Sequence, residues 1–148
     1  MITTRTANVT DLDWLIKQCR AFADFYDSKK SVMGSDEYAM EFLSNMIKNH
    51  VVFIALVNEE RSGFIAGMKQ PHHFNPAITV LSELFWWVTK EYRGSRSGAI
   101  LLDEFVKYGK ENCDWMTFTL EEVTPISDKA LLKRGFRLTE KAYLSEVQ

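Results

Sequence analysis

The feature that most constrains the fold is an uninterrupted series of a strand, a glycine- and arginine-containing turn, and a helix. Residues 78–88 are largely apolar and include the aromatic run ELFWWV, which predicts a long strand. The turn EYRGSRSGAILL begins at Glu91, and apolar residues recur at helical spacing over residues 97–112. The order places the amino terminus of a helix at the end of a strand.

The turn has the composition of an anion-binding site. A helix amino terminus carries unpaired N–H groups and a partial positive charge, so it stabilises a bound anion. Gly94 and Gly98 let a ligand approach the backbone closely. Arg93 and Arg96 can donate charge-assisted hydrogen bonds to phosphate oxygens. We expect main-chain N–H groups from about Arg93 to Ala99 to hold a pyrophosphate.

The spacing within the turn excludes two common nucleotide-binding loops. The chain has no G-x-x-x-x-G-K-[ST] sequence and no G-x-G-x-x-G with an acidic partner downstream. P-loop and Rossmann folds are therefore not expected. A capped turn with solvated arginines is the alternative that the local composition leaves open.

Length and composition favour a single globular domain over residues 1–148. The chain is 46% hydrophobic and 26% charged, and its net charge of −2 argues against a broad nucleic-acid or membrane surface. No apolar run reaches membrane-spanning length and no signal-peptide core is present, so a cytoplasmic location is expected. Cys19 and Cys113 provide neither a disulfide framework nor a metal cluster, and no metal is expected.

The remaining periodicities predict an α/β domain with a mixed sheet. The first helix is expected to begin at a capping box formed by Thr10 and Asp13, and the second after Gly34 and Ser35. In chain order we expect a strand at 2–7, helices at 10–26 and 35–47, strands at 51–57, 63–69 and 78–88, a helix at 97–112, a strand at 114–120, a helix at 125–134, and one or two strands within 136–147. Three layers follow from this order.

The same turn carries a family resemblance. It resembles the GNAT superfamily, the GCN5-related N-acetyltransferases, whose [QR]-x-x-G-x-[GA] signature aligns with Arg93-Gly94-Ser95-Arg96-Ser97-Gly98. The V-x-P-x-Y-R-G lead-in is similar to residues 88–94, and the late x-x-G-F to residues 133–136. The resemblance covers nearly the whole chain. Arg96 replaces the usual glycine, and this R-G-x-x-x-G form is similar to variant GNAT-like proteins, several of them phage-encoded.

The resemblance implies a three-layer α/β/α fold whose mixed, mainly antiparallel sheet is splayed at its centre. It also implies an N-acetyltransferase that transfers an acetyl group from acetyl-CoA to a primary amine by direct attack in a ternary complex. The pantetheine arm would lie in the gap, and the pyrophosphate on the turn. The residues expected to bind acetyl-CoA are Trp86, Trp87, Val88, Arg93, Gly94, Ser95, Arg96, Ser97, Gly98 and Ala99.

Transfer to an amine calls for a general base, because a free alkyl amine is mostly protonated near neutral pH. Glu83 is the first candidate. In an extended strand it shares a face with Phe85 and Trp87, and desolvation among aromatic rings would raise its pKa. A solvent-facing or salt-bridged glutamate is the simpler alternative. The other candidate bases are Glu121, Glu122, His72 and His73.

The resemblance also implies a proton donor for the leaving thiolate. Many family members have a tyrosine in the helix before x-x-G-F, where this chain has Leu131. Ser127 and Tyr143 are the substitutes we consider, and Cys113 as an acyl carrier has no evident activating base nearby. Leu131 and Arg96 favour the alternative of a catalytically lapsed GNAT-like module that binds CoA or a protein partner.

The acceptor is not identified by the sequence. Residues 26–35 and 69–77 are expected to flank its entrance, and their mixed composition leaves polyamines, aminoglycosides, amino acids and protein amino termini open. The expected partner is thus a small-molecule or peptide amine. A membrane partner is not expected, and Lys29, Lys30 and the two turn arginines make too small a basic face for nucleic acid. A homodimer is left open.

Overall fold

The computed structural model describes residues 1–26, 33–121 and 126–147, which contain five strands and four α-helices. The strands are β1 (Ile2–Thr6), β2 (Val51–Val57), β3 (Glu60–His72), β4 (Asn75–Val88) and β5 (Trp115–Thr117). The α-helices are α1 (Leu12–Tyr26), α2 (Asp36–Asn49), α3 (Ser97–Asn112) and α4 (Lys129–Leu132). The short 3-10 helices are Val9–Asp11 and Lys90–Tyr92.

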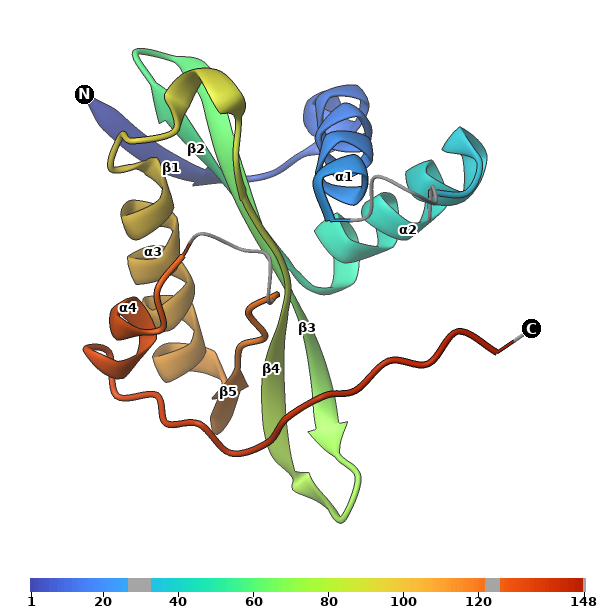
Figure 1. Ribbon diagram of the computed structural model, residues 1–148, viewed down its shortest axis with the longest axis vertical. Helices are drawn as coiled ribbons and strands as arrows, with labels where there is room; N and C mark the ends of the chain where they lie inside the picture. The colour runs from blue at the N-terminus through green and yellow to red at the C-terminus, as the bar shows by residue number, and fades with distance from the viewer. Residues whose placement is uncertain (27–32, 122–125, 148) are drawn as a thin grey trace.

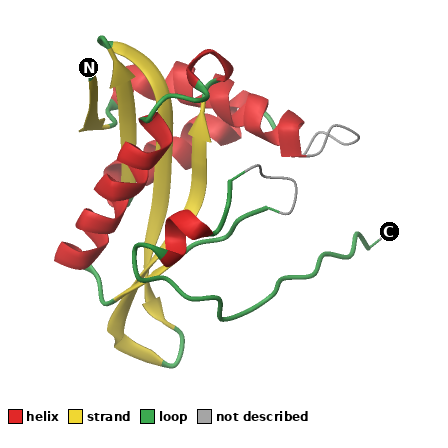
Figure 2. Cartoon of the chain, turned by 60° about the vertical axis from the view of Figure 1, so that its left-hand side comes forward, coloured by secondary structure: helices red, strands yellow, loops and turns green. Residues whose placement is uncertain are grey.

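The strands form one sheet in the order β1-β2-β3-β4-β5 (Figure 1). Neighbours from β1 to β4 are antiparallel, whereas β5 runs parallel to β4. Helices α1 and α2 pack on one face, and α3 with α4 lies on the other (Figure 2). The predicted three-layer domain with a mixed, mainly antiparallel sheet is confirmed.

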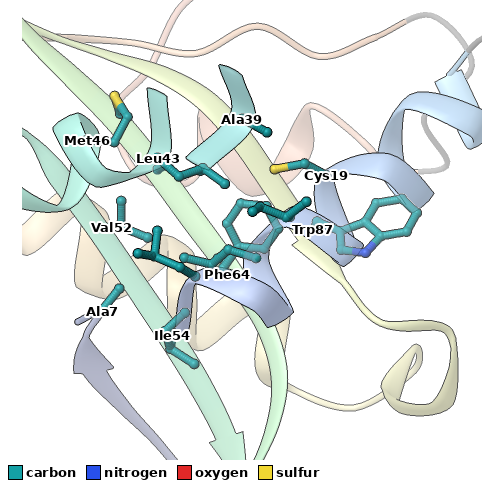
Figure 3. Close-up of a cluster of buried hydrophobic side chains, with 13 residues drawn as sticks. Ala7, Cys19, Ala39, Leu43, Met46, Val52, Ile54, Phe64 and Trp87 are labelled. Atoms are coloured by element: carbon teal, nitrogen blue, oxygen red, sulfur yellow. The ribbon is translucent and has the colours of Figure 1, made fainter. Parts of the chain in front are cut away.

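The core consists of apolar clusters on both faces of the sheet. Val52, Ile54 and Phe64 pack beneath α1 and α2 and are at most 1% exposed (Figure 3). Ala55 and Ile65 belong to the cluster on the α3 side. Because both faces of β2 are covered, its side chains are apolar at successive positions rather than alternately. The predicted strand at 51–57 is confirmed with the same bounds.

The amino-terminal capping box lies two residues earlier than predicted. Oδ1 of Asn8 accepts a hydrogen bond from the main-chain N–H of Thr10 at 2.9 Å, and Oδ2 of Asp11 accepts one from Asn8 at 2.8 Å. The pairing of Thr10 with Asp13 is therefore wrong. Asp11 is favoured because its buried carboxylate also makes a bidentate pair with Arg5, with both distances 2.7 Å, whereas Asp13 is exposed.

The β3–β4 hairpin is longer than predicted. Residues 70–77, expected as a loop, continue both strands as far as the pair His72 and Asn75, with a turn at His73 and Phe74. Pro71 is accommodated because the register shifts beside it, where a missing N–H does not interrupt a regular ladder.

The strand predicted at 114–120 is short and half-exposed rather than buried. Strand β5 lies at the sheet edge, and Trp115 is 51% exposed. The chain leaves the ladder after Thr117 because Phe118 packs its ring against Phe105 of α3 and Phe136 after α4, with centroids 5.2 and 5.6 Å apart. Aromatic packing here replaces strand pairing.

The carboxyl-terminal third departs furthest from the predicted elements. Helix α4 covers only part of the helix expected at 125–134, and residues 122–125 lie outside the described residues. The described residues 136–147 contain no strand, so the final strands predicted there are absent.

Candidate functional site

The site lies where β4 and the chain after β5 separate. Their ladder ends at the pair Ser82 and Thr117. Beyond it, the main-chain N–H of Thr119 donates to Oε1 of Glu83 at 3.3 Å. The sheet is thus open between the end of β4 and the chain after β5. This opening agrees with the predicted splaying of the sheet at its centre.

A bulge in β4 determines the face on which Glu83 lies. The register shifts between Ala66, which pairs with Phe85, and Gly67, which pairs with Glu83, so Leu84 is left over. A Cβ on Gly67 would meet Phe105, which places this register position on the α3 side. Phe85 instead packs in the cluster beneath α1 and α2. The predicted shared face of Glu83 and Phe85 is therefore wrong, because a bulge reverses the alternation.

Burial nevertheless raises the pKa of the Glu83 carboxyl to about 7. The hydrogen bond from Thr119 opposes this shift, and the negative charge of Glu121 adds to it. Glu83 lines a cavity of about 230 Å³, here called the small cavity, together with Phe22, Trp86 and other residues. A carboxyl with such a pKa exchanges its proton near neutral pH.

A larger cavity of about 420 Å³ extends from this region to the turn before α3. It shares Phe22, Trp86, Glu121 and Ile126 with the small cavity. Its wall also includes Trp87, Val88, Arg93, Gly94, Ser95, Gly98 and Ala99. Seven predicted binding residues besides Trp86 therefore line one cavity, which connects the turn to the surroundings of Glu83.

The conformation of the turn leaves several N–H groups available. Gly94 has φ +90°, a conformation that favours glycine. Arg96 has φ −83°, so the position needs no glycine and a side chain is accommodated. Among the described residues, no hydrogen-bond acceptor is found for the main-chain N–H groups of Gly94, Arg96, Gly98 and Ala99. Their grouping at a helix amino terminus suits a phosphate group.

A chain of serine hydroxyls connects the turn to β3. The hydroxyl oxygens of Ser62 and Ser97 are 2.8 Å apart, and both residues are buried. The hydroxyl of Ser95 donates to Oγ of Ser97 at 3.0 Å. The Ser97 side chain thus supports the turn from inside, and neither it nor Arg96 lines the large cavity.

Arg93 forms part of the wall between the turn and the aromatic end of β4. Its Nε donates to the carbonyl oxygen of Val88 at 3.2 Å. Its guanidinium carbon lies 4.6 Å from the ring centroid of Trp87 and 5.5 Å from that of Phe25. The arginine is therefore oriented by aromatic faces beside the cavity.

The comparisons with known proteins agree with this geometry. Residues 14–136 match the Acetyltransferase (GNAT) family. The chain belongs to the GNAT acetyltransferases. No curated protein has a significant sequence match to it.

Several solved structures share the fold over nearly the whole chain. A predicted acetyltransferase from Clostridium acetobutylicum, solved with acetyl-CoA, is 20% identical, with coverage of 99% of this chain and 96% of the other and a TM-score of 0.73. AAC(6')-Iy in complex with the bisubstrate analog CoA-S-monomethyl-acetylneamine is 17% identical, with coverage of 100% and 99% and a TM-score of 0.74. A transcriptional regulator from Bacillus halodurans is 16% identical, with coverage of 99% and 100% and a TM-score of 0.79. At these identities the likeness shows the fold.

Neither proposed proton donor lines the small or the large cavity, although Ser127 follows Ile126, which lines both. Oγ of Ser127 accepts a hydrogen bond from the N–H of Lys129 at 3.2 Å, and Tyr143 is 89% exposed. The roles of both residues stay predictions. Leu131, at the position where the resemblance implies a tyrosine, is buried against Leu102 and Val106 of α3.

The other candidate bases are dispersed. Glu121 lines both cavities, whereas Glu122 lies outside the described residues. His72 and His73 stack on each other at the hairpin turn, with centroids 4.6 Å apart. They flank the start of β4, whereas the cavities are lined by its end. The expected flanking loop at 69–77 is therefore not among the cavity walls.

The two cysteines take no part in the cavity walls. Burial raises the pKa of Cys19 to about 12, and Cys19 is a core residue as predicted. Burial also raises the pKa of Cys113, which leaves its thiol protonated at neutral pH.

Two further observations concern metals and membranes. Among the described ranges, no group of three His, Cys, Asp or Glu side chains is arranged to hold a metal ion. Of the helices in this part of the chain, none combines the length and apolarity of a membrane span.

Sequence reasoning missed several cavity residues. Phe22 and Phe25 of α1 line the large cavity, as does Arg134, which pairs with Asp103 at 2.7 Å. Phe22 belongs to the apolar face of α1, and its spacing predicts only a core contact. No local signal distinguishes a core aromatic from one at a cavity wall, because the opening arises from a neighbouring strand that departs from the sheet.

Proposed function

We propose that this GNAT acetyltransferase uses acetyl-CoA to acetylate a primary amine by direct attack in a ternary complex. The proposal rests on one observation, which is that the turn and Glu83 are connected by adjoining cavities. Free N–H groups of the turn open onto the large cavity, and this cavity adjoins Glu83 through shared walls. An anion site and a proton acceptor thus lie along one path.

The turn fits the donor's pyrophosphate. The unpaired N–H groups of Gly94, Arg96, Gly98 and Ala99 would donate to its oxygens, and the exposed guanidinium of Arg96 would add charge. The aromatic end of β4, with Trp86 facing the open gap, would contact the apolar part of the donor. Acetyl-CoA supplies the thioester whose acetyl group is transferred.

Glu83 would accept the proton of the acceptor ammonium. Above about pH 7 its carboxylate is charged, and its buried surroundings favour taking up a proton. Glu121 is the alternative base, since it lines both cavities. The charge of these two carboxylates suits a cationic acceptor, either a small molecule or a peptide amine, and not nucleic acid.

One observation favours a second function. Leu131 places an apolar side chain at the expected position of the proton-donating tyrosine, and Ser127 and Tyr143 do not line the cavities. A chain without a donor could bind CoA or a protein partner without catalysis. The two functions differ in whether free thiol is released.

Thiol release from acetyl-CoA over a panel of primary amines tests the proposal. We expect amine-dependent release by the native chain and a fall of about 100-fold or more in Glu83→Gln. The matched control is Glu111→Gln, because Glu111 is an exposed glutamate of α3 outside both cavities. Its rate should equal that of the native chain.

A binding measurement with acetyl-CoA distinguishes the acetyltransferase from a module that binds CoA without catalysis. Ligand at about 100 times its Kd should stabilise the native chain by about 2.7 kcal/mol. A thermal shift without thiol release would establish the second function. Absence of any shift would exclude both. The cytoplasmic location and the kinship with phage-encoded variants remain predictions from the sequence.

A further inference from the structure

The small and large cavities meet at a junction that two aromatic rings border. Among the described residues, Phe22, Trp86, Glu121 and Ile126 line both cavities. Phe22 packs with the cluster beneath α1 and α2, whereas Trp86 packs with the clusters on the α3 side. The two rings therefore border the junction from opposite faces of the sheet.

The ring of Trp86 is held in place by contacts on the α3 side. Its Nε1–H donates to the carbonyl oxygen of Gly98, in the first turn of α3, at 3.1 Å. Its ring packs edge-on against Phe118, with centroids 5.5 Å apart, and Phe118 packs in the same way against Phe105 at 5.2 Å. Moving the indole would break the hydrogen bond and disrupt the ring packing. Trp86 therefore has little freedom to move aside for a ligand.

The ring of Phe22 is held on the other face. It packs edge-on against Trp87 and Phe85, with centroids 5.3 and 6.1 Å apart. Trp87 is buried, and its Nε1–H donates to Oε1 of Gln18 at 3.0 Å. Closely packed rings of this kind transmit a displacement to their neighbours rather than absorb it. Both sides of the junction are therefore firm walls.

The geometry of acyl transfer directs the acyl chain at these walls. Under the proposed function, the thioester sulfur lies in the large cavity and the amine approaches from the side of Glu83. The amine nitrogen forms a bond to the acyl carbon and the carbon–sulfur bond breaks. One proton of the ammonium goes to Glu83, and a second ends on the leaving sulfur. At the tetrahedral stage nitrogen and sulfur take two of the four directions around the acyl carbon, so the oxygen and the acyl chain point to the sides.

We propose that Phe22 and Trp86, here called the acyl filter, admit an acetyl group and reject longer acyl chains. The inference rests on the proposed function, because the tetrahedral stage requires an amine in the small cavity. A methyl group adds little bulk beside the rings, whereas each further methylene must displace one of them. Without an amine, a longer chain can turn into the small cavity. The filter therefore acts on kcat and not on the affinity for the donor.

Thiol release from acetyl-, propionyl- and butyryl-CoA tests the acyl filter, with the amine that gives the fastest release from acetyl-CoA. In the native chain we expect kcat to fall about tenfold or more for each added methylene. Calorimetry without amine should give similar Kd values for the three thioesters. This split between kcat and Kd separates the acyl filter from a donor site that excludes long chains.

Variants of the two rings assign the selection to them. Trp86→Ala or Phe22→Ala should raise the ratio of kcat for butyryl-CoA to kcat for acetyl-CoA about tenfold or more, because the missing ring leaves room for the chain. The ratio cancels a general loss of activity in either variant. The matched control is Trp115→Ala, which removes the same ring at a half-exposed position outside both cavities and should leave the ratio unchanged.

The outcomes distinguish the acyl filter from the proposed function. Equal kcat values for the three thioesters in the native chain would overturn the filter alone, and this comparison needs no variant. A ratio that neither ring variant raises, or that Trp115→Ala raises equally, would also overturn it. Butyryl-CoA that binds about tenfold more weakly than acetyl-CoA would place the selection in donor binding instead. Absence of release from every thioester would overturn the proposed function, and the filter with it.

Discussion

The main-chain N–H of Thr119 donates to the carboxylate of Glu83 at 3.3 Å, across the opening between β4 and the chain that follows β5. This contact joins the two sides of the gap beyond the last strand pair. It also directs one carboxylate oxygen at a fixed donor. The titration of Glu83 therefore affects both activity and stability.

The pH dependence of activity should follow Glu83. The carboxyl must lose its proton to act as a base, and its pKa is about 7. We expect kcat/KM to rise tenfold per pH unit below about pH 7 and to level off above it. In Glu83→Gln, most of the activity should be lost, and kcat/KM should no longer rise with pH below about pH 7. If kcat/KM of the variant still rose with pH in the same range, the ionisation would belong to another group. Glu121→Gln would then be the next variant to measure.

The free energy of unfolding should also depend on Glu83, but it should fall as the pH rises, whereas activity increases. The pKa rises from 4.5 to about 7 on folding, so the folded state binds the proton more tightly. The stabilisation is complete below about pH 4.5 and is lost as the pH rises through about 7. At about 1.4 kcal/mol per pKa unit, the difference is on the order of 3 kcal/mol.

Glu83→Gln should therefore be more stable than the native chain at pH 8, and equally stable at pH 5. Glutamine can still accept the hydrogen bond from Thr119 and carries no charge. Denaturant unfolding at the two pH values measures this difference. A variant less stable at pH 8 would mean that the charged carboxylate is favoured by contacts other than those described.

Gly94 should be needed for donor binding. Its φ of +90° disfavours any residue with a Cβ, at a cost of about 1–2 kcal/mol. Gly94→Ala should weaken acetyl-CoA about tenfold by calorimetry, because the turn relaxes and its N–H groups diverge. Gly34→Ala is the control, since a Cβ at Gly34 meets nothing within 4 Å and no positive φ is involved. Equal affinities for the two variants would contradict the role of the turn.

Asp11 should stabilise the fold without affecting donor binding. Its carboxylate is fully buried and accepts hydrogen bonds from Arg5, Arg61 and the N–H of Asn8. Burial acts to raise its pKa, but these hydrogen bonds outweigh it and lower the pKa to about 2. Asp11→Asn should cost about 3 kcal/mol and lower Tm by about 10 °C.

The control for this change is Asp13→Asn, because Asp13 is exposed and lies only two residues further along the chain. It should shift Tm only slightly. The contribution of Asp11 is present above pH 3.8 and is lost as the pH falls through about 2. A Tm difference between Asp11→Asn and the native chain that persists unchanged at pH 2 would exclude this origin.

Local patterns in the sequence determined the elements that are proposed to bind the donor. The strand at 51–57 and the helix at 97–112 have the predicted bounds, because their side-chain periodicities depend only on residues nearby in the chain. Gly94 and the helix amino terminus likewise define the turn by local conformation. The GNAT resemblance followed from the order of these elements together with the signature.

The tertiary structure alone decided the surroundings of Glu83. Its face depends on a bulge at Leu84, which arises from pairing with β3 and is invisible in an alternating pattern. The gap beside it depends on Phe118 leaving the sheet to pack with α3. The strands predicted within 136–147 are absent from the described residues, although the edge strand β5 has only one strand neighbour there. Local propensity fixes how a segment prefers to fold, and contacts between distant segments decide whether it does.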